Sequence, residues 1–437
     1  MVRTAVIIAE PAVAGARVAG LSVVERWARQ ARRAGIVELR VLEPAAAGLE
    51  GRTRSTTAPG DGLMLDLAEP VLLIHGGGIC QGPVLERLVA QEPAPDAAVL
   101  ATSSCVGASP SSAIQVRLKQ GQVEALGQEV EGADGVSLGV VLCPPELARE
   151  LLEAPGTGFV SGLARLAARG RLRAAVLQEV CWLPVTDESA RQAAEHRLLR
   201  SGIKPTDSLL ARHLDRHLSL AITRRLLPTA VTPNQVTLVS LTVGLLGSLA
   251  FVPGAHGADV AGAALLLVSS VLDGCDGELA RLRLEESRLG GWLDLVGDNA
   301  VHVALFVGIG VGAYHRSGAP AQLLLGGIAG LGVLLSFATV WYFRLRRRRG
   351  PGPLFTSVAP GKGRAGALAL VTRLDNALGN RDFLYLLLLL ALLDRLGWIL
   401  WAGAVGANLF FLSLFLVNVA ARNGGERGPR AASGARP

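Results

Sequence analysis

Residues 273–298 read DGCDGELARLRLEESRLGGWLDLVGD and join two long apolar runs of the chain. One pair of aspartates, Asp273 and Asp276, ends the first run, and a second pair, Asp294 and Asp298, begins the next. Ionisable groups at the edge of a membrane span cost free energy, so they are seldom placed there without a function. This stretch is therefore the first candidate for a functional site, and its apolar surroundings predict a membrane domain.

The spacing of the charged and small residues predicts that they converge. Five of them share one face of a predicted helix, because they recur at i, i+3, i+4, i+7 and i+8: Asp273, Asp276, Gly277, Ala280 and Arg281. Asp294 and Asp298 are four residues apart on the next predicted helix, and residues 282–290 turn the chain between the two. The helices can then run antiparallel and bring four carboxylates together.

Four converging carboxylates repel one another in a low-dielectric site unless cations lie between them. Oxygen ligands without His or Cys favour Mg²⁺ or Mn²⁺. Gly277 and Ala280 leave the helix face bare, and Arg281 offers a donor fork for a phosphate. Gly290 allows a close approach at the start of the next helix. These features suit a diphosphate nucleotide and phosphoryl-type transfer. The alternative is that these carboxylates lie at the membrane interface and form ion pairs with arginines, without a catalytic role.

The complete pattern D-x2-D-G-x2-A-R-x8-G-x3-D-x3-D resembles the signature of the CDP-alcohol phosphatidyltransferase family. The resemblance implies a metal-dependent enzyme that moves a phospho-alcohol group from a CDP-linked donor to an acceptor hydroxyl and releases CMP. The ligands that it implies for two metal ions are Asp273, Asp276, Asp294 and Asp298. Asp298 is also the implied catalytic base for the acceptor hydroxyl. The positions that it implies beside the CDP group are Gly277, Ala280, Arg281 and Gly290.

His302 lies four residues beyond Asp298 and could join a polar relay. A histidine satisfied by helix packing is the favoured interpretation, so His302 is not among the predicted site residues.

Most of the chain resembles the bifunctional inositol-1-phosphate cytidylyltransferase/di-myo-inositol-phosphate-phosphate synthase proteins. The segments that carry this second resemblance are 18–36, 181–208 and 232–237. It implies a cytosolic nucleotidyltransferase domain that makes CDP-inositol, and a membrane domain that joins CDP-inositol to inositol 1-phosphate.

The first domain departs from that family where its chemistry would occur. The expected Gly-rich loop is shortened to residues 10–20, in which Gly15 and Arg17 remain. No lysine precedes Lys119, and His75 with glycines stands where a metal-binding aspartate is expected. The triphosphate of a nucleotide bound at this loop would then have little positive charge to neutralise it. We therefore expect a degenerate, inactive or altered nucleotidyltransferase domain; an active cytidylyltransferase is the alternative.

The two halves of the 437-residue chain differ in the length and spacing of their apolar runs. In the first half, short apolar runs alternate with helical patterns, which predicts an α/β domain with a largely parallel, Rossmann-like sheet. The expected strands are 4–10, 37–42, 70–76, 97–103, 113–119 and 135–143, and the expected helices are 22–35, 82–91 and 144–154. We expect domains at 1–200 (nucleotidyltransferase-like), 201–230 (linker and juxtamembrane helix), 231–421 (six-span transferase) and 422–437 (cytoplasmic tail).

The second half predicts an all-α membrane domain. Six apolar stretches approach the ~20 residues that a ~30 Å hydrocarbon core requires. They are about 234–253, 258–276, 293–314, 321–343, 379–393 and 397–419. A buried soluble helix explains any one of them, but not six in succession.

Charge sets the expected orientation. The segment between the fourth and fifth stretches holds Arg344, Arg346, Arg347, Arg348, Arg349, Lys362, Arg364, Arg373 and Arg381. The loops on the other side offer only Arg316 and Arg395. The positive-inside rule then places the first domain, the active site and the C-terminus of a multi-pass cell-membrane protein in the cytoplasm. Because the positive charge clusters at membrane edges, nucleic acid is not an expected partner.

Residues 208–227 predict an amphipathic juxtamembrane helix. Leu210, Leu214, Leu218 and Ile222 recur every four residues, with Thr206 and Asp207 as candidate N-caps. Such a helix would lie on the cytoplasmic leaflet, whereas a linker helix packed on protein is the alternative.

The five cysteines are Cys80, Cys105, Cys143, Cys181 and Cys275, without a C-x-x-C pair or zinc-ligand spacing. We expect reduced, mostly buried thiols.

Three functions fit these patterns. The favoured function is a CDP-alcohol phosphotransferase that acts on an inositol phosphate or similar polyol. A phospholipid synthase that uses CDP-diacylglycerol is the second, and a cation transporter that uses the intramembrane carboxylates is the third. The expected partners are a CDP-linked donor, a polyol or polyol-phosphate acceptor and membrane lipid, with a homodimer left open.

Overall fold

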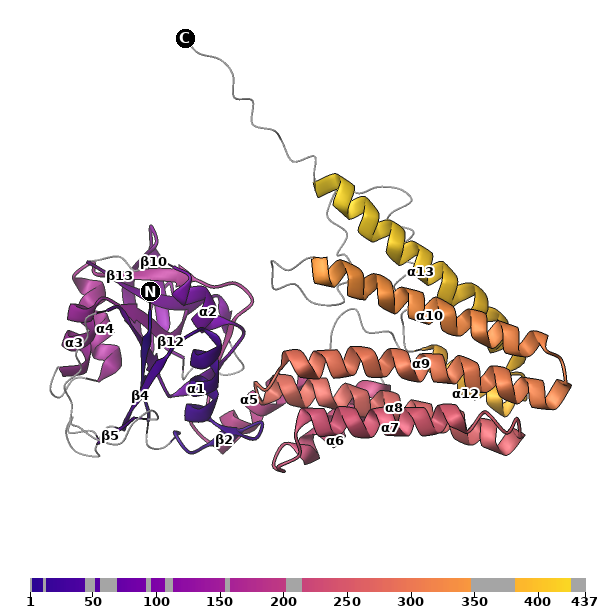
Figure 1. Ribbon diagram of the computed structural model, residues 1–437. Helices are drawn as coiled ribbons and strands as arrows, with labels where there is room; N and C mark the ends of the chain where they lie inside the picture. The colour runs from indigo at the N-terminus through magenta and orange to yellow at the C-terminus, as the bar shows by residue number, and fades with distance from the viewer. Residues whose placement is uncertain are drawn as a thin grey trace, which may run out of the picture. The chain divides into compact units, whose positions relative to one another are not determined.

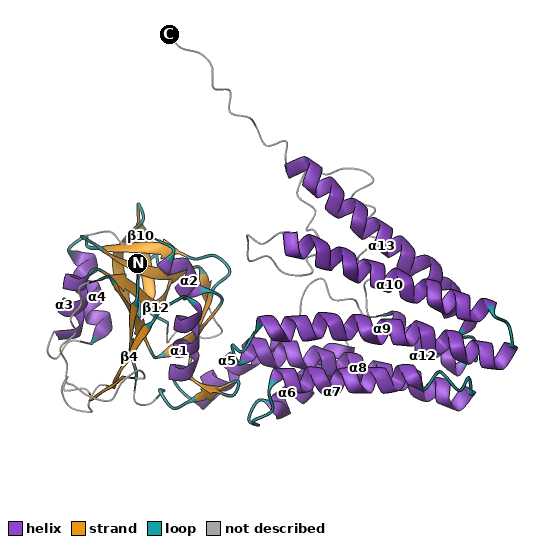
Figure 2. Ribbon diagram, in the orientation of Figure 1, coloured by secondary structure: helices purple, strands orange, loops and turns teal. Residues whose placement is uncertain are grey.

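A computed structural model describes residues 2–10, 13–43, 52–55, 69–91, 96–106, 113–153, 158–201, 214–346 and 382–425. The chain forms two compact units (Figures 1 and 2). The first contains residues 1–202 together with 281–284, and the second contains 203–280 and 285–437.

The first unit is built on a nine-stranded sheet, in the order β10-β11-β13-β8-β12-β6-β1-β4-β5. Its strands are β1 (Thr4–Ile8), β4 (Glu38–Glu43), β5 (Arg52–Ser55), β6 (Val71–His75), β8 (Ala98–Ser103), β10 (Gln115–Lys119), β11 (Gln122–Gly127), β12 (Gly135–Cys143) and β13 (Leu172–Val176). All six strands predicted from the apolar runs are present. The three predicted helices are also present, as α1 (Val23–Arg33), α2 (Val84–Val89) and α3 (Pro145–Glu153).

The prediction of a largely parallel sheet was wrong. Only the pairs β1–β4, β1–β6 and β8–β13 are parallel, and β12 runs antiparallel to both of its neighbours, β6 and β8. The connection from β10 to β11 is a two-residue turn, and a parallel pair needs a crossover of a dozen or more residues, so β10 and β11 pair antiparallel.

Helices cover the sheet on both faces. α3 and α4 (Phe159–Ala168) lie on one face and α1 on the other (Figure 1). The core on the α3–α4 face joins strand residues such as Leu73 and Leu100 to Leu147 and Leu163 of the helices. α1 begins with a capping box, in which Ser22 and Glu25 bond to each other's backbone N–H groups.

A second, three-stranded sheet joins β7 (Gly78–Gln81), β14 (Cys181–Pro184) and β9 (Cys105–Val106). The Trp182 ring packs so closely on Gly78 that a Cβ atom at that residue would lie 2.6 Å from it. Cys80, Cys143 and Cys275 are free, as expected, but Cys181 is disulfide-bonded.

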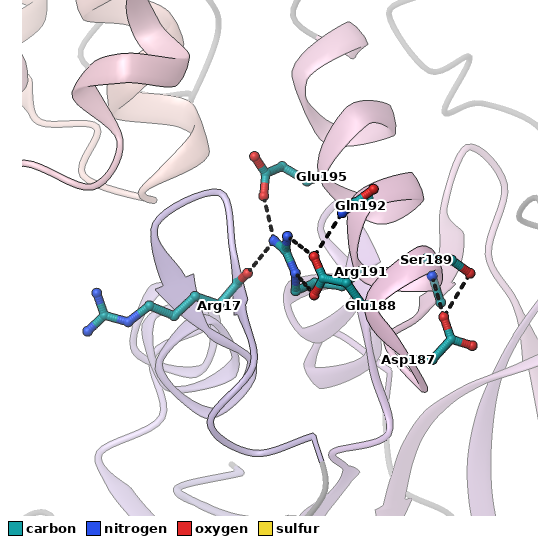
Figure 3. A network of polar contacts seen from close by, with 8 residues as sticks. Arg17, Asp187, Glu188, Ser189, Arg191, Gln192 and Glu195 are labelled. Atoms are coloured by element: carbon teal, nitrogen blue, oxygen red, sulfur yellow. Dashed lines mark hydrogen bonds and ion pairs between the residues drawn. The ribbon is translucent and has the colours of Figure 1, made fainter.

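A polar network fixes α5 (Glu188–Arg200) to the hairpin of β2 (Arg17–Val18) and β3 (Leu21–Ser22), as Figure 3 shows. The Arg191 guanidinium donates to Glu188 at 2.6 Å, to Glu195 at 2.9 Å and to the Arg17 carbonyl at 3.0 Å. The Asp187 side chain caps α5 by accepting from Ala190 N–H, and that bond holds the Asp187 pKa below its usual value. The shortened loop 10–20 is therefore anchored through the Arg17 backbone.

The second unit is helical in the part that the structure describes. Its helices are α6 (Arg216–Leu226), α7 (Pro233–Leu249), α8 (His256–Leu282), α9 (Arg288–Ser317), α10 (Ala321–Arg346), α12 (Phe383–Leu392) and α13 (Gly397–Gly425). Four contain stretches long and apolar enough to cross a membrane: His256–Leu282, Arg288–Ser317, Ala321–Phe343 and Gly397–Leu416. These four helices indicate a membrane protein.

Each of the six predicted apolar stretches contains a helix, but the count of six spans stays a prediction. α7 has 17 residues, and the described part of α12 has 10. Most of the arginine-rich segment, from Arg347 to Arg381, lies outside the described residues, as do Thr206, Asp207, Leu210 and residues 426–437 of the tail.

Small residues bring the membrane helices into close contact. A Cβ atom at Gly312 of α9 would lie 2.0 Å from the Phe251 carbonyl oxygen, which follows α7. Gly310 of α9 meets Gly326 of α10 in the same way. Close backbone approach through small residues is a main source of helix association in membranes. These contacts fix the position of α9, which carries half of the predicted aspartates.

Candidate metal and nucleotide site

Three of the four signature aspartates converge where α8 ends and α9 begins. Asp273, Asp294 and Asp298 each offer an oxygen atom, and these atoms all lie within 4.8 Å of one another. The turn between the helices passes through Leu284 at a φ of 56°, and Ser287 caps α9 by accepting from the Gly290 N–H at 2.9 Å. Three hard oxygen donors at this spacing fit a divalent cation such as Mg²⁺ or Mn²⁺.

Asp276 lies beside this trio but in a different environment. Its carboxylate is buried and accepts a hydrogen bond from the Thr237 hydroxyl of α7. Asp294 interacts electrostatically with Asp273, Asp298 and Asp276, so the fourth carboxylate belongs to the same charged cluster. Mutual repulsion in such a cluster favours a bound cation.

The predicted CDP-lining positions are placed on the same two helices. Gly277 and Ala280 are partly buried on α8, and Arg281 is exposed in its last turn. A Cβ atom at Gly290 would lie 2.9 Å from the Asn234 side-chain oxygen and 3.0 Å from the Ser287 hydroxyl. A larger residue at this position would require the Asn234 side chain of α7 or the Ser287 hydroxyl to shift.

A cavity extends from the aspartates into the helical unit. It is enclosed by residues of α7, α8, α9 and α12, and its polar lining is Thr237, Ser240, Ser269, Ser270, Asp273, Asp294, Asp298 and His302. The remaining wall is mostly apolar, with residues such as Leu241, Leu266 and Phe383. The sequence reasoning had missed the serines, although Ser269 and Ser270 lie one helical turn before Asp273 and share its face.

Residues 230–361 match the family model described as CDP-alcohol phosphatidyltransferase. The chain therefore carries a CDP-alcohol phosphatidyltransferase family-model domain. The match contains the whole aspartate signature and confirms the family that the spacing had indicated.

Curated relatives match about half of the chain. A bifunctional IPC transferase and DIPP synthase of Rubrobacter xylanophilus is 32% identical over 220 residues, which are 49% of this chain and 50% of that protein. The chain spans about half the length of the curated relatives of this description.

Two solved structures also resemble the chain. A phosphatidylinositol phosphate synthase of Mycobacterium tuberculosis, with CDP-DAG bound, is 20% identical, with 51% of this chain and 100% of that chain covered and a TM-score of 0.31. An inositol-1-phosphate CTP transferase from T. maritima is 12% identical, with 44% and 94% covered and a TM-score of 0.35.

Glu278 is a second residue that the sequence reasoning had missed. It occupies a variable position of the CDP-alcohol phosphatidyltransferase signature, and its carboxylate is almost completely buried. It accepts from Ser219 at 2.7 Å, from Thr223 at 2.8 Å and from Arg216 at 3.1 Å, all of α6. α6 is thereby fixed to the signature helix through its polar face.

The same contacts bear on whether the juxtamembrane helix lies on the membrane surface or packs on protein. The polar face of α6 packs on protein, as the alternative had it, with Ser219 and Thr223 buried. The apolar residues Leu214 and Leu218 remain 47% and 54% exposed. The described part of this helix is therefore amphipathic, with its apolar side left for another environment.

Replacing Glu278 by alanine should lower the stability of the CDP-alcohol phosphatidyltransferase domain by about 3 kcal/mol, because it removes one buried carboxylate that accepts from Arg216, Ser219 and Thr223. Thermal unfolding of the detergent-solubilised protein would measure this loss. Glu286→Ala, which removes an exposed carboxylate from the turn after α8, is the matched control. Equal melting temperatures for the two variants would contradict this role of Glu278.

Two side chains form a hydrogen bond at the predicted nucleotide site of the first unit. His75 at the end of β6 lies 2.9 Å from the Glu10 carboxylate, which follows β1, and this hydrogen bond lowers the Glu10 pKa. A Cβ atom at Gly77 would lie 3.0 Å from the His75 ring and 3.1 Å from the Glu10 carboxylate. The space where a metal-binding aspartate is expected is therefore taken by these two side chains.

Proposed function

We propose that this chain is an integral-membrane CDP-alcohol phosphotransferase of the cell membrane. The observation that carries the proposal is the convergence of Asp273, Asp294 and Asp298 in the wall of a cavity. The reaction transfers a phospho-alcohol group from a CDP-linked donor to an acceptor hydroxyl, with release of CMP. The acceptor is an inositol phosphate, which is supported by relatives described as IPC transferase and DIPP synthase.

Each signature residue has its own role in the proposed reaction. Asp273, Asp276 and Asp294 hold one or two ions, Mg²⁺ or Mn²⁺, and Asp298 holds the ion while it takes the proton of the acceptor hydroxyl. A divalent ion bound there would neutralise charge on the transferred phosphate. Gly277, Ala280 and Gly290 give the CDP group room to approach the backbone, and Arg281 binds its phosphates.

The proposed domains are a cytoplasmic nucleotidyltransferase-like domain (1–200), a juxtamembrane segment (201–230), a six-span transferase domain (231–421) and a cytoplasmic tail (422–437). The active site faces the cytoplasm, because α9 leaves the side of the aspartates, α10 returns to it, and the arginine-rich segment follows α10 in the sequence. The exposed leucines of α6 then meet membrane lipid.

The distribution of charge argues against a cation transporter. Asp259, the other acidic residue of α8 before the signature, forms an ion pair with Arg316 at 2.6 Å. Residues 260–268 between Asp259 and the serines are VAGAALLLV, without an ionisable group. A cation path would need such groups along the membrane interior.

Release of CMP tests the proposed function directly. Purified protein supplied with CDP-inositol and inositol 1-phosphate should release CMP only when Mg²⁺ or Mn²⁺ is present. CDP-diacylglycerol with the same acceptor serves as the second donor. Release from the lipid donor alone would move the function to a phospholipid synthase, and no release from either donor would reject it.

The full-length chain should fail to make CDP-inositol from CTP and inositol 1-phosphate. The reason is the Glu10–His75 pair in the place of a metal-binding aspartate, together with the missing lysine. Pyrophosphate release measures this step, and CMP release from added CDP-inositol by the same sample shows that the protein is active. Metal-dependent pyrophosphate release would instead restore a bifunctional enzyme.

A further inference from the structure

One face of α6 is buried in the helical unit. Asp215, directly before the helix, recurs with Ser219, Thr223 and Leu227 at intervals of four residues, and all four residues are buried. Residues at this spacing share one face of a helix. We call this face the buried stripe of α6, and it is the surface through which α6 packs on its neighbours.

The buried stripe makes polar contacts with two other helices. Glu278 of α8 accepts from Ser219 and Thr223, as described above. At the beginning of the stripe, the Tyr385 hydroxyl of α12 donates a hydrogen bond to the Asp215 side chain. α6 therefore connects α8, which carries two of the signature aspartates, with α12.

The first turn of α12 forms part of the cavity wall. Phe383 and Leu384 line the cavity that also contains Asp298. The Phe383 ring packs on the His302 imidazole of α9 at a centroid distance of 5.7 Å. Tyr385 follows directly, and successive residues of a helix are rotated by about 100°, so these neighbours face different partners. The hydrogen bond from Tyr385 to α6 therefore supports this wall from behind.

We propose that Tyr385 is a positioning residue for the acceptor. Its hydrogen bond to Asp215 holds the first turn of α12, and with it Phe383 and Leu384, against the cavity. The acceptor is the substrate concerned, because Asp298, the proposed base for its hydroxyl, shares the cavity wall with these residues. The predicted CDP-lining positions lie instead on α8 and α9. This inference rests on the proposed function and deepens it.

Tyr385→Phe tests this assignment, because it keeps the ring and removes only the hydroxyl. With CDP-inositol as donor and inositol 1-phosphate as acceptor, the KM for the acceptor should rise about 5-fold, the effect of one net hydrogen bond. The KM for the donor should stay unchanged. A lower melting temperature with both constants unchanged would show a structural role only and would overturn the assignment, as would an equal rise in both constants.

Two variants of Asp215 test the partner of this hydrogen bond. Asparagine keeps an oxygen atom that accepts from the Tyr385 hydroxyl, so Asp215→Asn should keep a nearly normal acceptor KM. Asp215→Ala removes the acceptor atom and should raise the acceptor KM about 5-fold. Because both residues act through one bond, the double variant Asp215→Ala/Tyr385→Phe should be no worse than either single variant. Effects that multiply in the double variant would contradict the proposal.

Tyr314→Phe is the matched control. Tyr314 of α9 is partly buried, as Tyr385 is, but it is not among the residues that line the cavity. Its replacement removes the same hydroxyl group and should leave both KM values unchanged. A rise in the acceptor KM as large as that of Tyr385→Phe would show that loss of any tyrosine hydroxyl in this unit has the same effect.

Thiol labelling separates this inference from the proposed function. Leu384→Cys places a thiol in the cavity wall, and a small water-soluble thiol reagent reports how often the first turn of α12 opens. Mass spectrometry of the peptide that contains residue 384 gives the labelling rate independently of the native cysteines. Adding Tyr385→Phe should raise this rate about 5-fold, whereas adding Tyr314→Phe should not.

The labelling rate does not depend on catalysis. If it rises with Tyr385→Phe but no CMP is released by any variant, the proposed function fails and the role of Tyr385 in holding α12 stands. Equal labelling rates with and without the Tyr385 hydroxyl would overturn the inference.

Discussion

Replacing Asp273 or Asp294 by asparagine should remove almost all metal-dependent CMP release while leaving the protein inserted in the membrane. Asparagine keeps the volume of the side chain but removes the negative charge that binds a hard cation. A metal ion contributes several kcal/mol of charge stabilisation to such a transfer, so the loss should be at least about 10²-fold. CMP release at saturating Mg²⁺, measured on protein that sediments with membranes, gives the result.

Asp394→Asn provides the control for this pair of variants. Asp394 follows α12, is 62% exposed in its side chain and pairs with Arg316 rather than with the signature aspartates. Its replacement should leave CMP release within about twofold of normal, as is usual for exposed ion pairs. Near-normal turnover in Asp273→Asn or Asp294→Asn would reject the metal site.

The candidate site could be predicted from the sequence because its geometry is local to two helices. The residues at i, i+3 and i+4 of a helix share a face whatever the rest of the fold does, and a short turn forces the next helix to return. The structure brings together Asp273, Asp294 and Asp298 as that spacing predicts. The hydrogen bond from Thr237 to Asp276 was not predictable, because it needs the position of α7.

Glu278 shows where such reasoning fails. Its partners on α6 lie 55 to 62 residues earlier in the chain, so no local pattern connects them. From the sequence, Glu278 is one more charged residue near a membrane edge, and the serine and threonine of α6 are ordinary polar positions. Only the packing of α6 on α8 turns them into a buried network.

The first unit repeats this contrast between local and distant determinants. Apolar runs predicted its strands correctly, because the burial of a strand depends on the hydrophobicity of its own residues. The direction of β12 depends on the distant partners that it meets, β6 and β8. The departure at His75 was visible in the sequence, but its partner Glu10 was not, since the two residues meet only after β1 and β6 pair.

Replacing Asp298 by asparagine should reduce turnover on bound donor by at least about 10²-fold, the usual contribution of a positioned general base. Asp298 is the most exposed of the three converging aspartates and lines the cavity, so it is the one placed to meet an acceptor hydroxyl. An amide cannot take the proton, although it can still offer an oxygen atom to the ion. Donor affinity should therefore change much less than turnover. Single-turnover CMP release with saturating acceptor, together with equilibrium binding of the CDP-linked donor, separates the two effects. If donor affinity falls and turnover on bound donor does not, Asp298 is a metal ligand only, and the proton must leave by another group.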